Sequence, residues 1–482
     1  MMPPRAPKAL RILMIASEAF PFSKTGGLAD VSTALSKALG RLGHDVTLIT
    51  PRYRGMESGA LVEEAQVHVA GIWWPVTFGE AALGPGARVL FLDCPPLYDR
   101  AGIYNENGVD YDDNAVRFGL LAAASVDWLS RQPDPYHIVH AHDWQAGLAP
   151  VYLRRAADPG TVFTIHNLAY QGVVSKEWVP RLGLSWADFT VNGFEFFDRL
   201  SFLKAGVNLA DAVTTVSPTY AEEIQRPEYG YGFDGIMRSR SYALTGILNG
   251  IDTDDWDPRR DRFLPAPYDA ADLSGKVAAK RELLATFGLP TSDDGLAEPV
   301  IGMVSRMVDQ KGLDLIAAIA GELPSLARFV ILGTGETRYQ DMWTGLAAGQ
   351  PERVGVHVGY DERRAHLIEG GADIFMMPSR FEPCGLNQMY SLRYGTVPVV
   401  RAVGGLVDTV RPYDPRNGQG TGFLFSDYAP WALRDSLQAA VHLYRSNPSG
   451  WARLQRNGMR KDFSWDRSAA EYVRVYKRVL AG

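Results

Sequence analysis

The stretch Lys24-Thr25-Gly26-Gly27-Leu28-Ala29-Asp30 has the residue types of an anion-binding loop. The apolar residues 10–16 before it predict a buried strand, and the apolar spacing over residues 28–42 predicts a helix that ends near Gly43. Two glycines and a lysine therefore lie between a strand end and a helix start, where backbone N–H groups and the helix dipole favour negative charge. This arrangement favours a phosphate-bearing ligand, although an ordinary turn with a solvated lysine would give the same pattern.

Polar side chains also end two later strands. The run His140-Ala141-His142-Asp143 closes one predicted strand, and His166-Asn167 directly follows another. Three histidines and an aspartate are possible metal ligands, but no further tight cluster of Cys, His or Glu joins them in the sequence. Helix capping is a sufficient explanation for Asp143. Carboxylate and imidazole groups also suit sugar hydroxyls, so we expect a sugar site here and no metal.

The second half of the chain repeats the opening arrangement. Residues 300–304 predict a strand, residues 305–312 a loop and the following residues a helix. Arg306 and Lys311 lie in this loop, where they can converge on a diphosphate, although solvated surface charges are the alternative. Gly404-Gly405-Leu406 echoes the opening motif and also suits an anion-facing loop.

Glu382 follows the strand predicted over residues 373–379. Pro383 suits the first turn of a helix, so we expect Glu382 at the start of one. Its carboxylate is then either a helix cap or a group aimed into a cleft between domains. A cysteine at a helix start can be an activated nucleophile. No histidine is near Cys384 in the sequence, which favours a packing or contact role.

Strand-like runs alternate with helical patterns through both halves, which predicts α/β folding around doubly wound parallel sheets. In such sheets ligands bind beyond the carboxyl ends of the strands. The run Gly333-Thr334-Gly335 half-resembles a dinucleotide fingerprint, but Arg338 replaces its third glycine and the strand before it is the second of its series. We therefore expect a close-packed turn there.

The composition narrows the function classes. A chain of 482 residues predicts two domains or more, and 46% hydrophobic with 22% charged residues is typical of a soluble globular protein. A net charge of −6 argues against nucleic-acid binding by the protein as a whole. Two cysteines, Cys94 and Cys384, suit a reducing cytoplasm. No apolar run is long enough for a signal sequence or a membrane span.

These motifs together carry a family resemblance. Besides the stretches above, the chain contains Asn249-Gly250-Ile251-Asp252, Glu382-Pro383-Cys384-Gly385-Leu386 and Gly404-Gly405-Leu406-Val407-Asp408-Thr409. In this order they resemble bacterial glycogen synthases and plant starch synthases over essentially the full length. The resemblance implies two Rossmann-like domains facing across a deep cleft, the GT-B architecture, with the last helix crossing back. We expect an N-terminal, acceptor-side domain over 1–247 with 465–482, and a C-terminal, donor-side domain over 248–464.

The resemblance also implies a role for each matching residue. Glu382, Arg306, Lys311 and His166 would form the catalytic group, with the two cations on the donor diphosphate and Glu382 facing the glucosyl ring. Lys24, Gly26, Gly27 and Asp30 would lie at the diphosphate. Further contacts would be Cys384, Gly385 and Leu386 to the sugar, Thr409 to the distal phosphate, Tyr360 to the adenine, and Asp143 and Asn249 to sugar and acceptor.

The implied reaction transfers glucose from ADP-glucose to an α-1,4-glucan with retained configuration, without a cofactor or metal. A two-step route would need a carboxylate nucleophile, for which Glu382 is the only strong candidate. The resemblance implies instead a same-face displacement, in which the departing phosphate takes the acceptor's proton. Domain closure on ADP binding, a cytoplasmic location and no nucleic-acid or membrane partner are expected. The alternatives are UDP-glucose as donor, another acceptor as in sucrose synthesis, a silent glucan-binding or nucleotide-sugar sensor, and a dehydrogenase. The last lacks a full Gly-x-Gly-x-x-Gly after the first strand.

Overall fold

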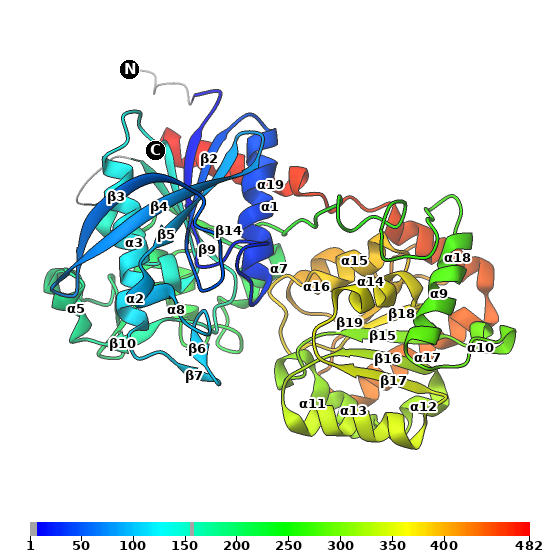
Figure 1. Ribbon diagram of the computed structural model, residues 1–482. Coiled ribbons are helices and arrows are strands. Elements are labelled where there is room, and N and C mark those ends of the chain that lie inside the picture. The colour runs from blue at the N-terminus through cyan, green and yellow to red at the C-terminus, as the bar shows by residue number, and fades with distance from the viewer. Residues whose placement is uncertain (1–6, 155–158) are drawn as a thin grey trace. The chain divides into compact units, whose positions relative to one another are not determined.

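The computed structural model describes residues 7–154 and 159–482 (Figure 1). The chain forms two compact units. Unit 1 comprises the described residues up to Gly250 together with Trp465–Gly482, and unit 2 is Ile251–Ser464. Each unit has a largely parallel sheet with helices packed on it, which confirms the α/β class that the alternating patterns predict.

The large sheet of unit 1 has the strand order β14-β13-β9-β8-β1-β2-β5-β4-β3. It is parallel from β14 to β5, and β4 and β3 add an antiparallel hairpin at one edge. Its strands are β1 (Arg11–Ile15), β2 (Asp45–Pro51), β3 (Ala60–Val69), β4 (Ile72–Gly84), β5 (Ala87–Asp93), β8 (Ile138–His142), β9 (Gly160–Ile165), β13 (Ala212–Thr215) and β14 (Leu244–Gly246).

Strands β1, β8 and β9 coincide with the strands predicted at residues 10–16, before Asp143 and before His166, because both of their faces are buried. The β3–β4 hairpin was not predicted. Much of β3 faces solvent, so its sequence has no continuous apolar run.

Two smaller sheets lie at the end of unit 1 toward which β1 runs (Figure 1). They are formed by β10 (Val173–Ser175), β12 (Arg199–Ser201) and β11 (Glu195–Phe196), and by the hairpin of β6 (Asn105–Glu106) and β7 (Val109–Asp110). The β6–β7 residues are exposed.

The helices of unit 1 are α1 (Gly27–Arg41), α2 (Pro95–Tyr98), α3 (Asn114–Ser130), α4 (Ala149–Leu153), α5 (Trp178–Arg181), α6 (Phe202–Leu209), α7 (Pro218–Glu223), α8 (Asp234–Ser239), α19 (Trp465–Ala481), η1 (Trp144–Ala146) and η2 (Trp186–Asp188). The C-terminal helix α19 packs on α1 and β9. Arg41 pairs with Asp466 at 2.7 Å, and the His140 Nδ1 lies 2.8 Å from the Tyr476 hydroxyl. The end of the chain thus completes the core of the first unit.

Unit 2 has a fully parallel sheet with the order β17-β16-β15-β18-β19-β20. The strands are β15 (Val300–Val304), β16 (Arg328–Gly333), β17 (Val354–Val358), β18 (Ile374–Met377), β19 (Val397–Arg401) and β20 (Phe423–Phe425). Alternate residues of a strand enter different cores: Phe329 and Ile331 belong to one apolar cluster, Val330 and Leu332 to another.

Its helices are α9 (Ser274–Thr286), α10 (Asp293–Ala297), α11 (Leu313–Ile319), α12 (Leu323–Leu326), α13 (Thr337–Gly349), α14 (Glu362–Gly371), α15 (Asn387–Arg393), α16 (Gly404–Thr409), α17 (Pro430–Ser446), α18 (Pro448–Met459) and η3 (Asp309–Lys311). Figure 1 shows α14 and α15 on one face of the sheet and α11 and α13 on the other. Within the described residues, no helix is both long and apolar enough to cross a membrane.

The proline- and aspartate-rich stretch at the start of unit 2 is anchored by aromatic stacking. Trp256 lies between His366 and Tyr390, with ring centroids 3.8 and 3.9 Å away and interplanar angles of 11° and 13°. The Asp261 carboxylate lies 2.7 Å from His366 Nδ1 and accepts a hydrogen bond of 2.6 Å from the Tyr394 hydroxyl. A segment without periodicity is therefore held by specific contacts instead of by a repeating apolar face.

The docking of α19 can be tested by substitution. We expect Tyr476→Ala to cost about 3–5 kcal/mol of unfolding free energy, because it removes a fully buried ring and the partner of His140. Arg474→Ala, at an exposed position of the same helix, is the matched control and should change stability by less than about 0.5 kcal/mol. Urea unfolding followed by circular dichroism measures both, and equal stability of the two variants would contradict the packing described.

Candidate active site

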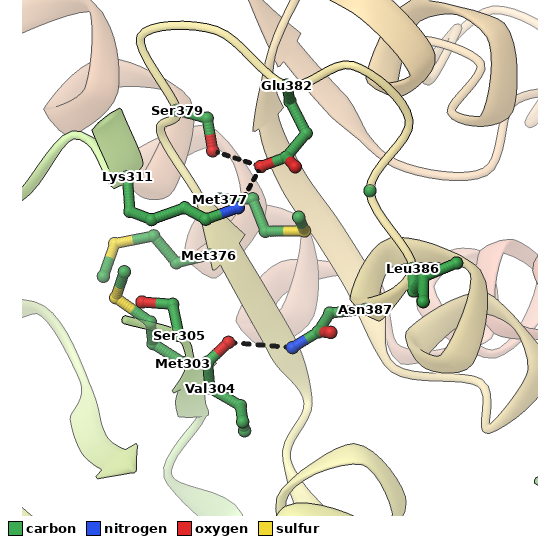
Figure 2. A pocket seen from close by; sticks show the side chains of 11 residues that line it. Met303, Val304, Ser305, Lys311, Met376, Met377, Ser379, Glu382, Leu386 and Asn387 are labelled. Carbon is green, nitrogen blue, oxygen red and sulfur yellow. Dashed lines mark hydrogen bonds and ion pairs between the residues drawn. The ribbon is translucent and has the colours of Figure 1, made fainter. Parts of the chain in front are cut away.

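Unit 2 has a cavity of about 140 Å³ at the carboxyl ends of β15 and β18, the edge where the sequence predicts ligand binding (Figure 2). Because β15 and β18 are neighbours in the sheet, the loops that follow them meet there. The cavity is lined by Met303, Val304, Ser305, Lys311, Met376, Met377, Ser379, Glu382, Gly385, Leu386 and Asn387.

Lys311 and Glu382 form an ion pair on the wall of this cavity. The Lys311 Nζ lies 2.6 Å from Glu382 Oε2, and the Ser379 hydroxyl donates to the same oxygen at 2.9 Å (Figure 2). The Glu382 residue is 6% exposed. A buried carboxylate needs such partners, since an unpaired charge removed from water is strongly destabilising.

Glycine fixes the position of Lys311. Gly312 lies between η3 and α11 and has a φ of +74°, a left-handed conformation that favours glycine. A Cβ on it would lie 2.1 Å from the Pro378 carbonyl oxygen, so the loops after β15 and β18 can touch only because the side chain is missing.

Arg306 lies on the same loop, as predicted. It is exposed, and its guanidinium donates to Gln310 Oε1 at 3.0 Å. The close-packed turn expected at residues 333–335 is also confirmed, because a Cβ on Gly333 would lie 1.9 Å from the Ser305 carbonyl oxygen. The turn after β16 thus supports the loop after β15, which carries Arg306 and Lys311.

The prediction that Pro383 begins a helix is wrong. Helix α15 begins at Asn387, and Gly385 has φ of +74°, which is incompatible with a right-handed helix through this stretch. Glu382 therefore lies in a loop and does not cap a helix. The Asn387 side chain donates to the Val304 carbonyl at 2.8 Å and ties the start of α15 to the end of β15.

Gly404 and Gly405 pack against this loop. Cβ atoms on them would lie 1.9 Å from the Glu382 carbonyl oxygen and 2.2 Å from that of Cys384, and the Gly405 N–H donates to the Glu382 carbonyl at 3.1 Å. In this structure the pair serves close backbone contact, whereas the sequence suggested an anion-facing loop. The glycines therefore hold the main chain of Glu382, while Lys311 and Ser379 hold its side chain.

The remaining predicted residues of unit 2 are spread around the cavity. Gly385 and Leu386 line it, whereas Cys384 is buried beside it. The Thr409 hydroxyl donates to the Gly405 carbonyl at 2.6 Å and accepts from Gln388 at 3.1 Å. Tyr360 follows β17, is 80% exposed and does not line the cavity.

In unit 1 the opening loop encloses a carboxylate of the protein itself. Glu18 accepts hydrogen bonds from the Thr25 N–H, the Thr25 hydroxyl at 2.7 Å, the Gly26 N–H at 3.3 Å and the Tyr104 hydroxyl. The loop amides do bind an anion, as their pattern indicates, but that anion is Glu18. Sequence reasoning missed Glu18, although an acidic residue closely following a buried strand was the available signal.

Lys24 pairs with Asp30 at 2.8 Å. The two belong to the same predicted motif, and their side chains are partly exposed. Gly27 is the first residue of α1, and Gly26 is its N-cap. The loop between β1 and α1 thus carries one cation, Lys24, whose charge is balanced by Asp30.

The three histidines predicted at strand ends lie together. His142 Nδ1 is 3.0 Å from His166 Nε2, and the centroids of the His140 and His142 rings are 4.1 Å apart, with an interplanar angle of 34°. Asp143 has φ of +55°, and its carboxylate accepts the His166 N–H at 2.7 Å. Burial raises the pKa of Asp143 to about 7 and lowers those of His140 and His166 to about 3.

Some buried polar atoms at this edge have no hydrogen-bond partner among the described residues. They include Asn249 Oδ1, beyond the end of β14, and His142 Nε2, at the end of β8. Such atoms are costly unless a ligand or water pairs with them. Over residues 7–154 and 159–482, no three Asp, Glu, His or Cys side chains are grouped as a metal site requires.

Comparisons with known proteins agree with this geometry. A family profile described as "Starch synthase catalytic domain" matches residues 11–239, and one described as "Glycosyl transferases group 1" matches residues 293–453. A glycogen synthase of Anaeromyxobacter dehalogenans is 48% identical over 98% of this chain and 100% of its own length. That of Myxococcus xanthus is 47% identical with the same coverage.

Two solved structures are similar to this one. The catalytic domain of starch synthase IV from Arabidopsis thaliana, bound to ADP and acarbose, is 32% identical with a TM-score of 0.90, covering 98% of this chain and all of that one. Sucrose-phosphate synthase from Thermosynechococcus elongatus has a TM-score of 0.62, 98% and 99% coverage and 19% identity, which shows a shared fold only.

The two Rossmann-like units and a site at the carboxyl edge of a parallel sheet define a glycosyltransferase of the GT-B fold. Similarity over the whole length then identifies the family. The chain belongs to the family of bacterial glycogen synthases and starch synthases, which are glucosyltransferases.

The histidine cluster makes unit 1 sensitive to acid. The folded state keeps His140 and His166 neutral down to about pH 3, whereas the unfolded chain binds their protons below about pH 6.5. Their contribution to stability is therefore lost as the pH falls below 6.5, at up to about 1.4 kcal/mol per histidine and pH unit. The raised pKa of Asp143 has the opposite effect, because it adds stability as the pH falls. The pKa of His142 is also lowered, so three histidines act against this one aspartate and the net stability falls.

We therefore expect the melting temperature to fall between about pH 7 and pH 5. His140→Asn should melt lower at pH 7, because it loses Tyr476 and Thr164 as partners, but should show a shallower fall. Calorimetric melts at a series of pH values measure both slopes. A variant with the same pH slope as the unmodified protein would contradict the assignment.

Proposed function

We propose that this protein transfers glucose from ADP-glucose to the non-reducing end of an α-1,4-glucan with retention of configuration. The observation that carries the proposal is the Lys311–Glu382 pair in the cavity of unit 2, with Arg306 on the same loop. Its relatives named glycogen synthase match it end to end, and a similar starch synthase was solved with ADP and acarbose bound. Unit 2 is the proposed donor side and unit 1 the acceptor side.

The cations act on the leaving group. Breaking the bond to ADP places negative charge on the diphosphate while the sugar becomes positively charged. Arg306 and Lys311, fixed at the end of β15, supply charge where it develops, which lowers the barrier without rearrangement at the moment of reaction. Lys24 and the Gly26–Gly27 loop have the same role from unit 1 in this proposal, and Asp30 lies beside them as the partner of Lys24.

Glu382 acts on the sugar. Ser379 and Lys311 hold one of its oxygens, so the carboxylate has a fixed orientation beside the cavity. We assign it to positioning the glucosyl ring and stabilising its positive charge, with Gly385, Leu386 and Cys384 as neighbouring sugar contacts. In the same-face displacement we propose, the acceptor hydroxyl bonds to the anomeric carbon as its bond to the phosphate oxygen breaks. The departing phosphate takes the acceptor's proton.

The polar edge of unit 1 suits sugar hydroxyls. His142 Nε2 and Asn249 Oδ1 are buried and unpaired there within the described chain, so hydroxyl groups can supply the missing partners. Asp143, with a pKa of about 7, can accept or donate near neutral pH, and His166 stays neutral. Thr409 toward the distal phosphate and Tyr360 toward the adenine complete the proposed contacts.

The proposal includes no metal and a cytoplasmic location. The charge compensation that a metal would give is assigned to Arg306 and Lys311. The location is supported by Cys94 and Cys384, which are both buried and are not joined in a disulfide.

Removal of either cation tests the assignment of the leaving-group site. We expect Arg306→Ala and Lys311→Ala each to lower kcat by about 100- to 1000-fold, as does loss of other groups that stabilise developing charge. Arg453→Ala, a substitution on α18, is the control with unchanged kcat. Initial rates with saturating glycogen measure the effect, and near-normal turnover by either variant would refute the role of that residue.

The donor is tested by rates with ADP-glucose and UDP-glucose side by side, in the presence and absence of EDTA. We expect faster transfer from ADP-glucose, unchanged by EDTA and lost in Glu382→Gln. Faster transfer from UDP-glucose would leave the proposed mechanism intact but would contradict the assignment of ADP-glucose as the donor. Glucan binding without transfer from either donor would favour the silent binding protein, and a nicotinamide-dependent absorbance change the dehydrogenase.

A further inference from the structure

Three loops of unit 1 hold aromatic rings in solvent. Phe197 is 79% exposed, Tyr170 54% and Tyr231 42%. Phe197 is at the tip of the β11–β12 hairpin, Tyr170 lies on the chain that continues from His166, and Tyr231 precedes α8. Figure 1 shows β10 and α8 at the same end of unit 1 as the β6–β7 hairpin. None of these rings has a part in the chemistry assigned above.

The three loops are in contact with one another. The Gln171 side chain donates to the Tyr231 carbonyl at 3.0 Å, which joins the first loop to the third. A Cβ on Gly232 would lie 3.4 Å from the Phe196 ring and 3.9 Å from the Phe197 ring, which joins the third to the hairpin. The rings therefore belong to one surface, here called the aromatic platform: Tyr170, Phe197 and Tyr231.

The platform is held in an uncommon backbone geometry. Phe197, Asp198 and Tyr231 have φ values of +49°, +59° and +48°, which residues other than glycine rarely adopt. Lys176 pairs with Asp198 at 2.6 Å, and the Asp198 N–H donates to Glu195 at 2.8 Å. A tight turn normally carries glycine or asparagine at such positions, so Phe197 costs conformational free energy in this turn. The turn leaves its ring in solvent.

The platform is continuous with the polar edge that contains Asp143. Asp143 accepts the backbone N–H of His166 at 2.7 Å, and Tyr170 follows four residues later in the same loop. Between them, the Leu168 N–H donates to the hydroxyl of Tyr220 on α7 at 3.1 Å, which fixes the course of this loop. A sugar chain bound at Asp143 therefore has the platform beside it.

We propose that the aromatic platform is an outer binding site for the α-1,4-glucan acceptor, on which glucose units remote from the transferred one stack. This inference rests on the proposed function. Aromatic faces bordered by amide and carboxylate groups, here Gln171 and Asp198, suit the apolar faces and hydroxyl groups of sugars. A short acceptor ends before the platform, whereas a glycogen chain reaches it.

The test compares long and short acceptors. Phe197→Asn and Tyr231→Asn remove the rings and keep a residue that tolerates positive φ. We expect each to raise the ratio of KM for glycogen to KM for maltotriose by about fivefold or more, which matches the loss of one aromatic contact. Tyr242→Asn is the matched control, because Tyr242 is 77% exposed but lies at the amino end of β14, whereas Tyr170 and Tyr231 lie beyond the carboxyl ends of β9 and β13. Its ratio should not change.

An unchanged ratio in both variants, in an enzyme that transfers glucose normally, would overturn the platform alone. Absence of transfer by the unmodified protein to either acceptor would overturn the proposed function instead. Size-exclusion chromatography separates a further outcome: a change of molecular mass in Phe197→Asn would show a contact between copies of the chain and would also overturn the inference.

Discussion

The ion pair between Lys311 and Glu382 is the interaction around which unit 2 is arranged. A carboxylate with 6% exposure is tolerated only with a cation and hydrogen-bond donors beside it, and Lys311 and Ser379 supply them. The pair also requires two loops to approach within contact distance. The adjacency of β15 and β18 and the missing side chain of Gly312 allow this approach. The glycines of α16 hold the other side of the Glu382 backbone.

Unit 1 also buries a carboxylate beyond a strand end, and holds it with neutral hydrogen-bond donors where unit 2 uses a lysine. Its loop amides and the Tyr104 hydroxyl surround the carboxylate of Glu18, and Lys24 is balanced by Asp30. The three histidines beneath are neutral because they are buried, and α19 supplies Tyr476 as a partner for His140. The C-terminal helix therefore stabilises the residues that border the proposed acceptor site, although it is far from them in the sequence.

Much of this arrangement could be predicted because parallel strands have buried faces and parallel sheets bind ligands at one edge. Residues 300–304 are apolar throughout and residues 138–142 are fully buried with an apolar start, so both strands and the polar residues at their ends were identified. The β3–β4 hairpin was missed because it is half exposed. The helix expected at Pro383 was wrong, because the need for Glu382 to meet Lys311 and for Gly385 to turn outweighs the local preference of proline. Glu18 was missed because its partners are scattered, with Tyr104 far along the chain.

A double-mutant cycle shows whether Lys311 and Glu382 act as one unit. The measured quantity is kcat with ADP-glucose and glycogen for Lys311→Met, Glu382→Gln and the double variant. We expect the double variant to lose about as much activity as the more damaging single variant, because each substitution already disables the pair. Losses that multiply across the two substitutions would contradict it, since they would show two residues acting independently.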